Sequence, residues 1–167
     1  GRFTPRAFSH ALLLEQPLFS LVAVESSDEA LGYLNKNINK FHLYNRVHVF
    51  PQRVDRLPQF VKENELDLIV ANPPYIAKDD PSVEKTVRDY EPPAALFSPD
   101  EGFGAIKNWL EVGIRLVKNE GYMVMEIGSN QESQVKLFAK KLGWEFLYIQ
   151  KDLAGLPRVV TLRKIEG

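Results

Sequence analysis

Two consecutive prolines, Pro73 and Pro74, follow closely after the strand-like run of residues 67–71. This run is β-branched and continuously apolar after its first residue, which is typical of a short strand buried on both faces. Proline fixes φ and lacks an N–H, and it also holds the preceding residue, Asn72, in extended backbone. Neither a sheet nor a helix can continue through such a segment. The sequence therefore predicts a stiff stub at the carboxyl end of a buried strand, where open α/β sheets place their ligands.

Strand-like and helix-like segments alternate along the chain. The expected strands cover residues 20–25, 46–50, 67–71, 122–127, 144–150 and 158–164. The expected helices cover residues 7–15, 28 to about 40, 101–118 and 131–142. Ser26 and Glu29 have capping-box spacing before the second helix. The alternation predicts an α/β sandwich around a mainly parallel sheet, with the last two strands antiparallel because no helix separates them.

Two other segments are expected to be irregular. Residues 51–64 are predicted to form a loop with a short helix. The polar, proline-containing stretch of residues 76–99 is long and lacks clear periodicity, which is typical of a functional loop or lid.

The residues on the stub suit methyl transfer to a nitrogen whose lone pair is delocalised. Such a nitrogen is a poor nucleophile because resonance flattens it. The side-chain oxygen of Asn72 and the carbonyl of Pro73 offer two acceptors for its two N–H groups, which would aim the nitrogen and favour positive charge on it. Tyr75 is expected to cover the substrate plane or to lie near a sulfonium cation. A proline-rich turn that only caps a strand is the alternative interpretation.

Bulk properties exclude several classes of protein. A chain of 167 residues predicts a single domain. With 21 basic and 22 acidic residues the net charge is −1, so direct binding of nucleic acid is not expected. The chain has no cysteine and its 3 histidines lack metal-ligand spacing, so no metal site is expected. No apolar stretch reaches the ~18–20 residues of a membrane span.

The residues around the stub resemble the core of class I S-adenosylmethionine-dependent methyltransferases that modify amide or exocyclic amino nitrogens. Further segments, in this order, look like the HemK/PrmC family of protein-(glutamine-N5) methyltransferases, which act on peptide-chain release factors. These segments are residues 1–6, 90–96, 101–102, 121–128 and 152–158. The resemblance covers nearly the whole chain. It implies a Rossmann-like sandwich, a single monomeric catalytic domain over residues 1–167, and no N-terminal helical domain of the kind that the family uses to hold the release factor.

The resemblance also implies a cofactor, a substrate and site residues. The cofactor is S-adenosyl-L-methionine, held by Glu25, Ser26 and Asn72, with the Glu25 carboxylate accepting hydrogen bonds from the ribose hydroxyls. The substrate is the glutamine of a Gly-Gly-Gln motif in a release factor. The implied substrate-binding residues are Asn72, Pro73, Pro74, Tyr75 and Glu91, of which Asn72, Pro73 and Tyr75 are also the implied catalytic residues. Glu126 is a further candidate for shaping the substrate side.

Two departures from the family pattern stand out. The glycine-rich cofactor loop and the central strand before it are not in the sequence, because Arg6 runs directly into the helix-like segment that begins at Ala7. Deleting a central strand would leave buried backbone groups unpaired, so we expect that the natural protein has further residues between these two positions. The second departure is Arg53, where the family carries an aspartate that meets the adenine; Asp55 comes two residues late.

Two other functions fit parts of the same pattern. One is an adenine or cytosine amino-methyltransferase of nucleic acid, which shares the four-residue motif that begins at Asn72. The other is an inactive subunit that keeps the methyltransferase fold for binding. The sequence is compatible with a cytoplasmic or a mitochondrial protein and does not decide between them.

Overall fold

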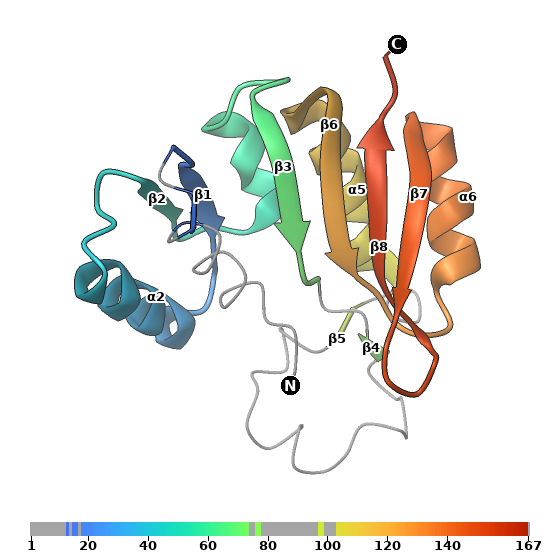
Figure 1. Ribbon diagram of the computed structural model, residues 1–167, viewed down its shortest axis with the longest axis horizontal. Coiled ribbons are helices and arrows are strands. Elements are labelled where there is room, and N and C mark those ends of the chain that lie inside the picture. The colour runs from blue at the N-terminus through green and yellow to red at the C-terminus, as the bar shows by residue number, and fades with distance from the viewer. Residues whose placement is uncertain are drawn as a thin grey trace. The chain divides into compact units, whose positions relative to one another are not determined.

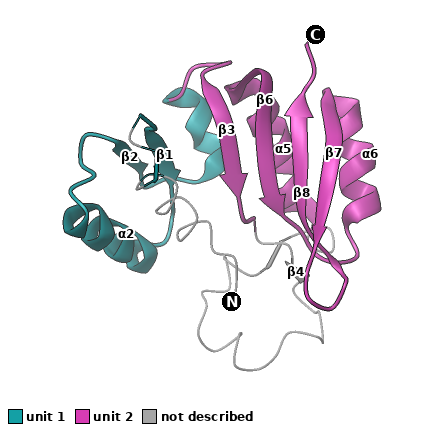
Figure 2. Cartoon of the chain, in the orientation of Figure 1, with its two compact units in different colours: residues 1–60 teal, residues 61–167 magenta. Residues whose placement is uncertain are grey.

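A computed structural model describes residues 13, 15–16, 18–73, 76–77, 97–98 and 103–166 (Figure 1). The chain divides into two compact units, residues 1–60 and 61–167, which Figure 2 colours separately. In the described ranges, no helix has both the length and the apolar character that crossing a membrane requires. The two units are considered one at a time.

The first unit is a β-α-β arrangement followed by a short 3-10 helix. Its elements are β1 (Leu21–Val24), α2 (Asp28–Lys40), β2 (Val47–Phe50) and η1 (Val54–Gln59). β1 and β2 pair in parallel, with Leu21 opposite Val47, and the helix between them provides the crossover that parallel strands need. Their small core contains Leu13, Ile38, Leu43 and Val47. The predicted helix of residues 7–15 is described only at Leu13 and Glu15, which are both helical.

The cap of α2 lies one residue later than the capping-box spacing predicts. Ser27, rather than Ser26, is the N-cap, and its side chain accepts a hydrogen bond from the N–H of Ala30 at 3.4 Å. The cause is Glu25, whose Oε1 accepts the N–H groups of both Ser26 and Ser27 at 2.9 Å. This carboxylate holds the residues between β1 and the helix, so the first helical turn begins at Asp28.

The second unit is a four-stranded sheet in the order β3-β6-β8-β7. Its elements are β3 (Leu66–Ala71), α5 (Phe103–Leu116), β6 (Val117–Glu126), α6 (Glu132–Leu142), β7 (Trp144–Lys151) and β8 (Pro157–Lys164). β3 and β6 are parallel, whereas β8 is antiparallel to both of its neighbours. The prediction that the last two strands are antiparallel is therefore confirmed. Figure 1 shows α5 and α6 on the same face of this sheet.

The core of the second unit lies between this face and the two helices. α5 comes closest at Gly113, where a side-chain Cβ would lie 3.2 Å from the sulfur of Met123 and 3.4 Å from Ile69. Trp144 is 1% exposed, and its Nε1 donates a hydrogen bond to the carbonyl of Leu110 at 3.2 Å. Burying an aromatic side chain of this size contributes roughly 1.5–3 kcal/mol, and the hydrogen bond satisfies its one polar atom.

The helix predicted over residues 101–118 ends earlier than expected. α5 stops at Leu116, because Val117 already pairs with Leu66 of β3. The register then shifts, so that residues 118–121 of β6 bulge out opposite Asp67 before Tyr122 pairs with Leu68. Glu120 has a φ of 62° within this bulge. Residues 119–121, which lie between the expected helix and the expected strand, are therefore part of a strand.

The long predicted loop of residues 76–99 is described only at its two ends. There the structure has two short parallel strands, β4 (Ile76–Ala77) and β5 (Phe97–Ser98). The remainder of the predicted loop lies outside the described residues. The short helix predicted within residues 51–64 is present as η1.

β1 and β3 each have one paired edge. β1 pairs with β2 and β3 pairs with β6, and within the described ranges neither strand has a partner on its other edge. The expected central strand would come from residues between Arg6 and Ala7. Those two positions lie outside the described residues, so the expectation of further residues there stays a prediction.

We predict that Gly121→Ala destabilises the protein by about 1–3 kcal/mol. An added Cβ would lie 2.7 Å from Val117 Cγ1, 2.9 Å from the Lys118 carbonyl and 3.0 Å from the Asp67 carbonyl. Because two of these atoms belong to the backbone, no rotamer change relieves the overlap. Denaturant unfolding monitored by circular dichroism measures the loss.

Gly32→Ala provides the matched control for this substitution. Gly32 lies in α2 and has nothing within 4 Å of a Cβ. Alanine there should stabilise the helix by up to about 1 kcal/mol, because it is the better helix former. Equal unfolding free energies for Gly121→Ala and the wild type would contradict the account of the bulge.

Candidate active site

Asn72 lies at the carboxyl end of β3 with its side chain exposed, while the next residue, Pro73, is fully buried. Ala71 pairs with Met125 of β6. Asn72, the next residue of the chain, therefore lies level with Glu126, the last residue of β6. The buried ring anchors the stub, and the exposed carboxamide beside it can contact a ligand. The proline pair predicts the end of the strand at this point, and the roles of Asn72 and Pro73 toward a ligand stay predictions.

The other predicted residues of the stub fall outside the described part of the chain. Pro74 and Tyr75 follow Pro73 directly, and Glu91 belongs to the long segment before β5. The expectations that Tyr75 covers the substrate and that Pro74 and Glu91 bind it therefore stay predictions.

Glu25 lies at the carboxyl end of β1, where its N–H donates to the Phe50 carbonyl at 3.2 Å. Its side chain is half-buried, and Oε1 accepts the two N–H groups of Ser26 and Ser27 described above. Hydrogen bonds from two backbone amides fix the orientation of the carboxylate. A carboxylate held in this way at a strand end has the chemistry to accept ribose hydroxyls. Ser26, the second predicted cofactor residue, is exposed beside it.

Arg53 and Asp55 form an exposed ion pair. Arg53 Nε donates to Asp55 Oδ1 at 3.2 Å, and the two side chains are 78% and 46% exposed. Exposed pairs of this kind contribute little stability, so the pair does not lock Asp55 in place. No contact described here gives Arg53 the role that the family's aspartate would have.

A buried glutamine supports the loop after β6. Gln131 is 2% exposed, and its Oε1 accepts the N–H of Gly128 at 2.8 Å. The contact holds the chain between Glu126 and α6 close to the end of the sheet. Sequence reasoning missed this residue, since a glutamine before a helix is more often exposed.

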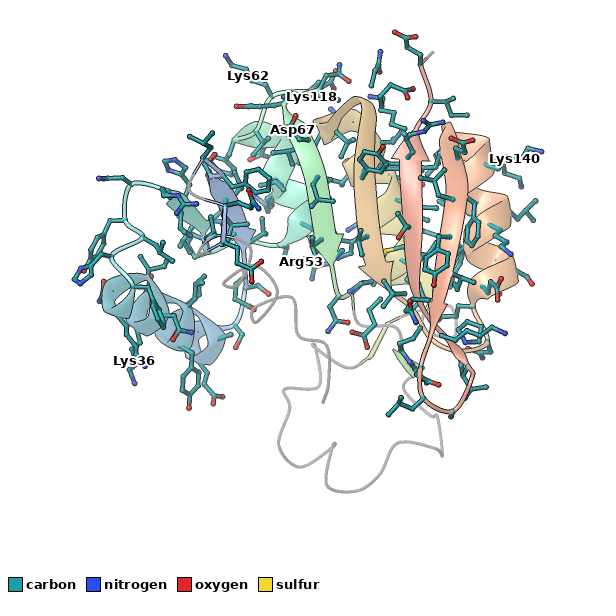
Figure 3. The ribbon with its side chains drawn as sticks, viewed as in Figure 1. Lys36, Arg53, Lys62, Asp67, Lys118 and Lys140 are labelled. Carbon is teal, nitrogen blue, oxygen red and sulfur yellow. The ribbon has the colours of Figure 1, made fainter. Side chains whose placement is uncertain are left out.

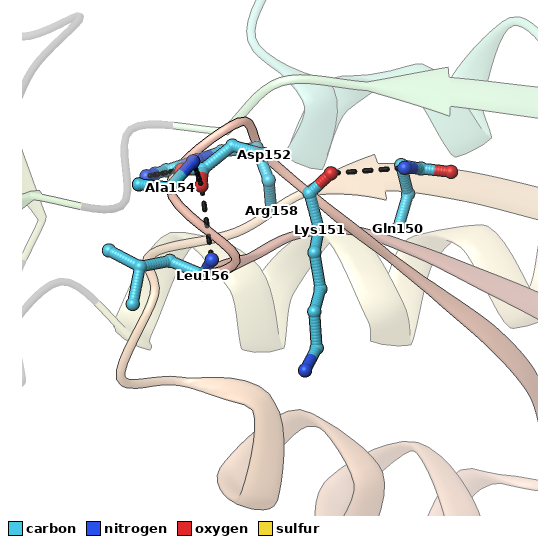
Figure 4. A network of polar contacts seen from close by, with 6 residues as sticks. All are labelled: Gln150, Lys151, Asp152, Ala154, Leu156 and Arg158. Carbon is cyan, nitrogen blue, oxygen red and sulfur yellow. Dashed lines mark hydrogen bonds and ion pairs between the residues drawn. The ribbon is translucent and has the colours of Figure 1, made fainter.

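The β7–β8 turn, residues 152–158, is organised by one aspartate (Figure 4). Asp152 Oδ1 accepts the N–H groups of Ala154 and Leu156 at 3.0 Å. Its Oδ2 accepts from Arg158 NH2 at 2.9 Å, and the N–H of Gly155, whose φ is +79°, donates to the Asp152 carbonyl. In the sequence, this segment lies between the expected strands of residues 144–150 and 158–164 and is also part of the family resemblance. The spacing of aspartate, glycine and arginine was a signal for such a turn.

The turn leaves the sheet at the same end as Asn72. Ile127, just after β6, donates its N–H to the carbonyl of Arg158 at 2.9 Å, and Glu126 lies opposite Val159 in the register. The carboxyl ends of β3 and β6 and the amino end of β8 therefore meet at one end of the second unit (Figure 1). In the part of the chain that the structure describes, no group of side chains could hold a metal ion.

Comparisons with known proteins agree with this geometry. No protein-family model matches the chain. A release factor glutamine methyltransferase from Streptomyces coelicolor is 33% identical over 161 residues, which are 95% of this chain and 55% of that protein. A bifunctional methyltransferase from Rickettsia felis is 30% identical over 156 residues, which are 93% of this chain and 29% of that protein. The chain thus spans little more than half of one relative and less than a third of the other.

Among solved structures, a candidate sarcosine dimethylglycine methyltransferase from Galdieria sulphuraria superposes with a TM-score of 0.65 at 12% identity. The match covers 96% of this chain and 75% of that one. The fold is that of a class I methyltransferase, as predicted. These sequence relatives confirm the resemblance to the HemK/PrmC family of release factor glutamine methyltransferases over about 95% of this chain.

We predict that the β7–β8 turn loosens as the pH falls below about 4. The Arg158 guanidinium, followed by the Leu156 N–H, lowers the pKa of Asp152 from its ordinary value. A group whose pKa is lowered by folding stabilises the folded turn above the unfolded pKa of about 3.9. This contribution is lost as the pH falls through the folded pKa. The protection of the Ala154 and Leu156 amides against hydrogen exchange, relative to the intrinsic rate at each pH, should therefore fall in acid.

The amide of Leu162, in the buried part of β8, serves as the internal control for global unfolding. Asp152→Asn, which has no charge to titrate, should show no such acid-specific change in the turn. If the protection of the Ala154 and Leu156 amides in the wild type is the same at pH 3 as at neutral pH, the stabilising role of the Asp152 carboxylate is contradicted.

Proposed function

We propose that the protein transfers a methyl group from S-adenosyl-L-methionine to the side-chain nitrogen of the glutamine in the Gly-Gly-Gln motif of a peptide-chain release factor. The observation that carries the proposal is an exposed Asn72 fixed by the buried Pro73 at the carboxyl end of β3. The names of the sequence relatives support the choice of substrate.

Asn72 and Pro73 orient the substrate amide. The Asn72 side-chain oxygen accepts one N–H of the glutamine, and the Pro73 carbonyl accepts the other. Accepting hydrogen bonds from both N–H groups orients the nitrogen toward the methyl donor. It also raises the electron density on the nitrogen as positive charge develops there. Pro73 has no N–H of its own and its ring restricts the backbone, which favours a fixed relation between the two proposed acceptors.

Glu25 is the residue proposed to hold the cofactor, with Ser26 beside it. The two backbone N–H groups on Oε1 hold the carboxylate at the end of β1, which fits a ribose that offers two hydroxyl donors. The cofactor supplies an electrophilic methyl group on a sulfonium. Tyr75 is proposed to lie near that cation, and Pro74 and Glu91 to contact the substrate.

A methylation assay tests the proposal directly. The protein should incorporate labelled methyl groups into a release factor that carries Gly-Gly-Gln and should fail with the Gln→Ala form of the same factor. Labelling of DNA or RNA in place of the factor would favour the nucleic-acid amino-methyltransferase. No binding of S-adenosylmethionine in calorimetry would favour the inactive binding subunit.

We predict that Asn72→Ala lowers kcat by about 10²–10³, because it removes one preorganised contact to the transition state. Folding should be nearly unaffected, since the side chain is exposed. Single-turnover kinetics with the release factor measure the effect.

Asn119→Ala is the control for this variant. Asn119 is also exposed, but it lies in the β6 bulge next to Lys118, which Figure 3 places beside Asp67 at the opposite end of the sheet. Its turnover should match that of the wild type. An unchanged kcat in Asn72→Ala would remove Asn72 from the mechanism.

We predict that Glu25→Gln weakens binding of S-adenosylmethionine by about 10- to 100-fold, the effect of replacing a charged hydrogen-bond acceptor by a neutral one. Isothermal titration calorimetry measures the dissociation constant. Glu29→Gln, an exposed acid in the first turn of α2, should bind like the wild type. Equal affinity in all three proteins would exclude Glu25 from the cofactor site.

A further inference from the structure

The β7–β8 turn displays two leucines to solvent. Leu153 is 108% exposed, which means that it has no neighbours covering it, and Leu156 is 46% exposed. Single exposed leucines are common on protein surfaces and need no explanation. Here, however, two of them occur within one short turn at the end of the sheet where Asn72 lies.

The backbone that carries these leucines is fixed by the protein itself. Asp152 accepts hydrogen bonds from Ala154 and Leu156, and its other oxygen pairs with Arg158 (Figure 4). The N–H of Asp152 also donates to the Leu156 carbonyl at 2.9 Å. The backbone of the turn is therefore held by hydrogen bonds, although Leu153 is fully exposed and Leu156 is about half-exposed. A partner that binds such a turn does not have to order it first, which favours affinity.

The position of the turn connects it to the proposed chemistry. β8 begins at Pro157, and only β6 separates β8 from β3. Two strand spacings amount to roughly 10 Å, so a protein chain bound at Asn72 extends easily to the turn.

The polar surroundings of the turn select the kind of partner. The Arg158 guanidinium is held by Asp152 rather than presented to an anion, and no aromatic residue lies within residues 151–158 for stacking on bases. Two leucines with one neighbouring lysine, Lys151, are also far less than the basic amphipathic surface that binds membranes. Of the partners considered, an apolar surface on a folded protein fits these side chains best.

We propose that Leu153 and Leu156 are a docking contact for the protein substrate, which they bind on an apolar surface beside the glutamine that is methylated. This inference rests on the proposed function. A few residues that become fully buried carry most of the energy of an interface, and two leucines on a turn held by hydrogen bonds offer apolar surface for such burial. The turn then sets the affinity for the whole release factor without contacting the reacting nitrogen.

The test is the double variant Leu153→Ser/Leu156→Ser in steady-state methylation of the intact release factor. We expect KM for the factor to rise at least tenfold while kcat at saturating factor stays within twofold of the wild type. The dissociation constant for S-adenosylmethionine and the thermal unfolding midpoint should not change. Leu137→Ser is the matched control, because Leu137 is a 62% exposed leucine on α6, and it should leave KM unaltered.

Asp152→Ala provides a second, independent variant. It keeps both leucines but removes the carboxylate that fixes them, so KM should rise in the same direction, whereas Leu153→Met should preserve it. A KM for the double variant within twofold of the wild type, or equal to that of Leu137→Ser, overturns the docking contact. A loss of kcat at unchanged KM overturns it as well. If the wild type methylates no release factor at all, the proposed function fails before this inference is reached.

Discussion

The parallel pairing of β3 with β6 holds the candidate site in place. Ile69 and Ala71 of β3 and Met123 and Met125 of β6 are all buried, so the end of β3 cannot slide without exposing apolar surface. A shift by one residue would turn this whole set of side chains to the other face of the sheet. Pro73, which is buried one residue beyond Asn72, extends the same restraint past the end of the strand. The position of the carboxamide is thus fixed by apolar burial and not by polar contacts of its own.

The sequence predicted the strands and helices well wherever a regular pattern decided them. The continuous apolar run before Asn72 and the helical spacing within α2 are examples. The antiparallel pairing of the last two strands followed because no helix separates them in the sequence. The errors arose where a contact that the sequence pattern does not show competed with the predicted one. The carboxylate of Glu25 moved the cap of α2 to Ser27, and pairing of Val117 with β3 ended α5 early. Neither contact produces a periodic pattern of residues in the sequence.

The candidate site was predictable to a different degree at each residue. The end of regular structure at Asn72 and Pro73 followed from the conformational limits of proline, whereas the burial of Pro73 was not foreseen. The role of Glu25 came only from family resemblance, while its two backbone hydrogen bonds were not foreseen. The nearness of the β7–β8 turn to Asn72 was not foreseen, because it depends on the sheet order, which brings the turn to the end of β3 although about 80 residues separate the two in sequence.

The consecutive prolines have a practical consequence for spectroscopy. Neither Pro73 nor Pro74 carries an amide proton, so proton–nitrogen correlation spectra contain no main-chain signal from the centre of the motif. The side-chain NH2 of Asn72 gives a resolved pair of resonances immediately before this silent stretch. That pair is therefore the natural reporter for titrations with substrate peptides, and it observes the carboxamide whose oxygen is assigned to the chemistry.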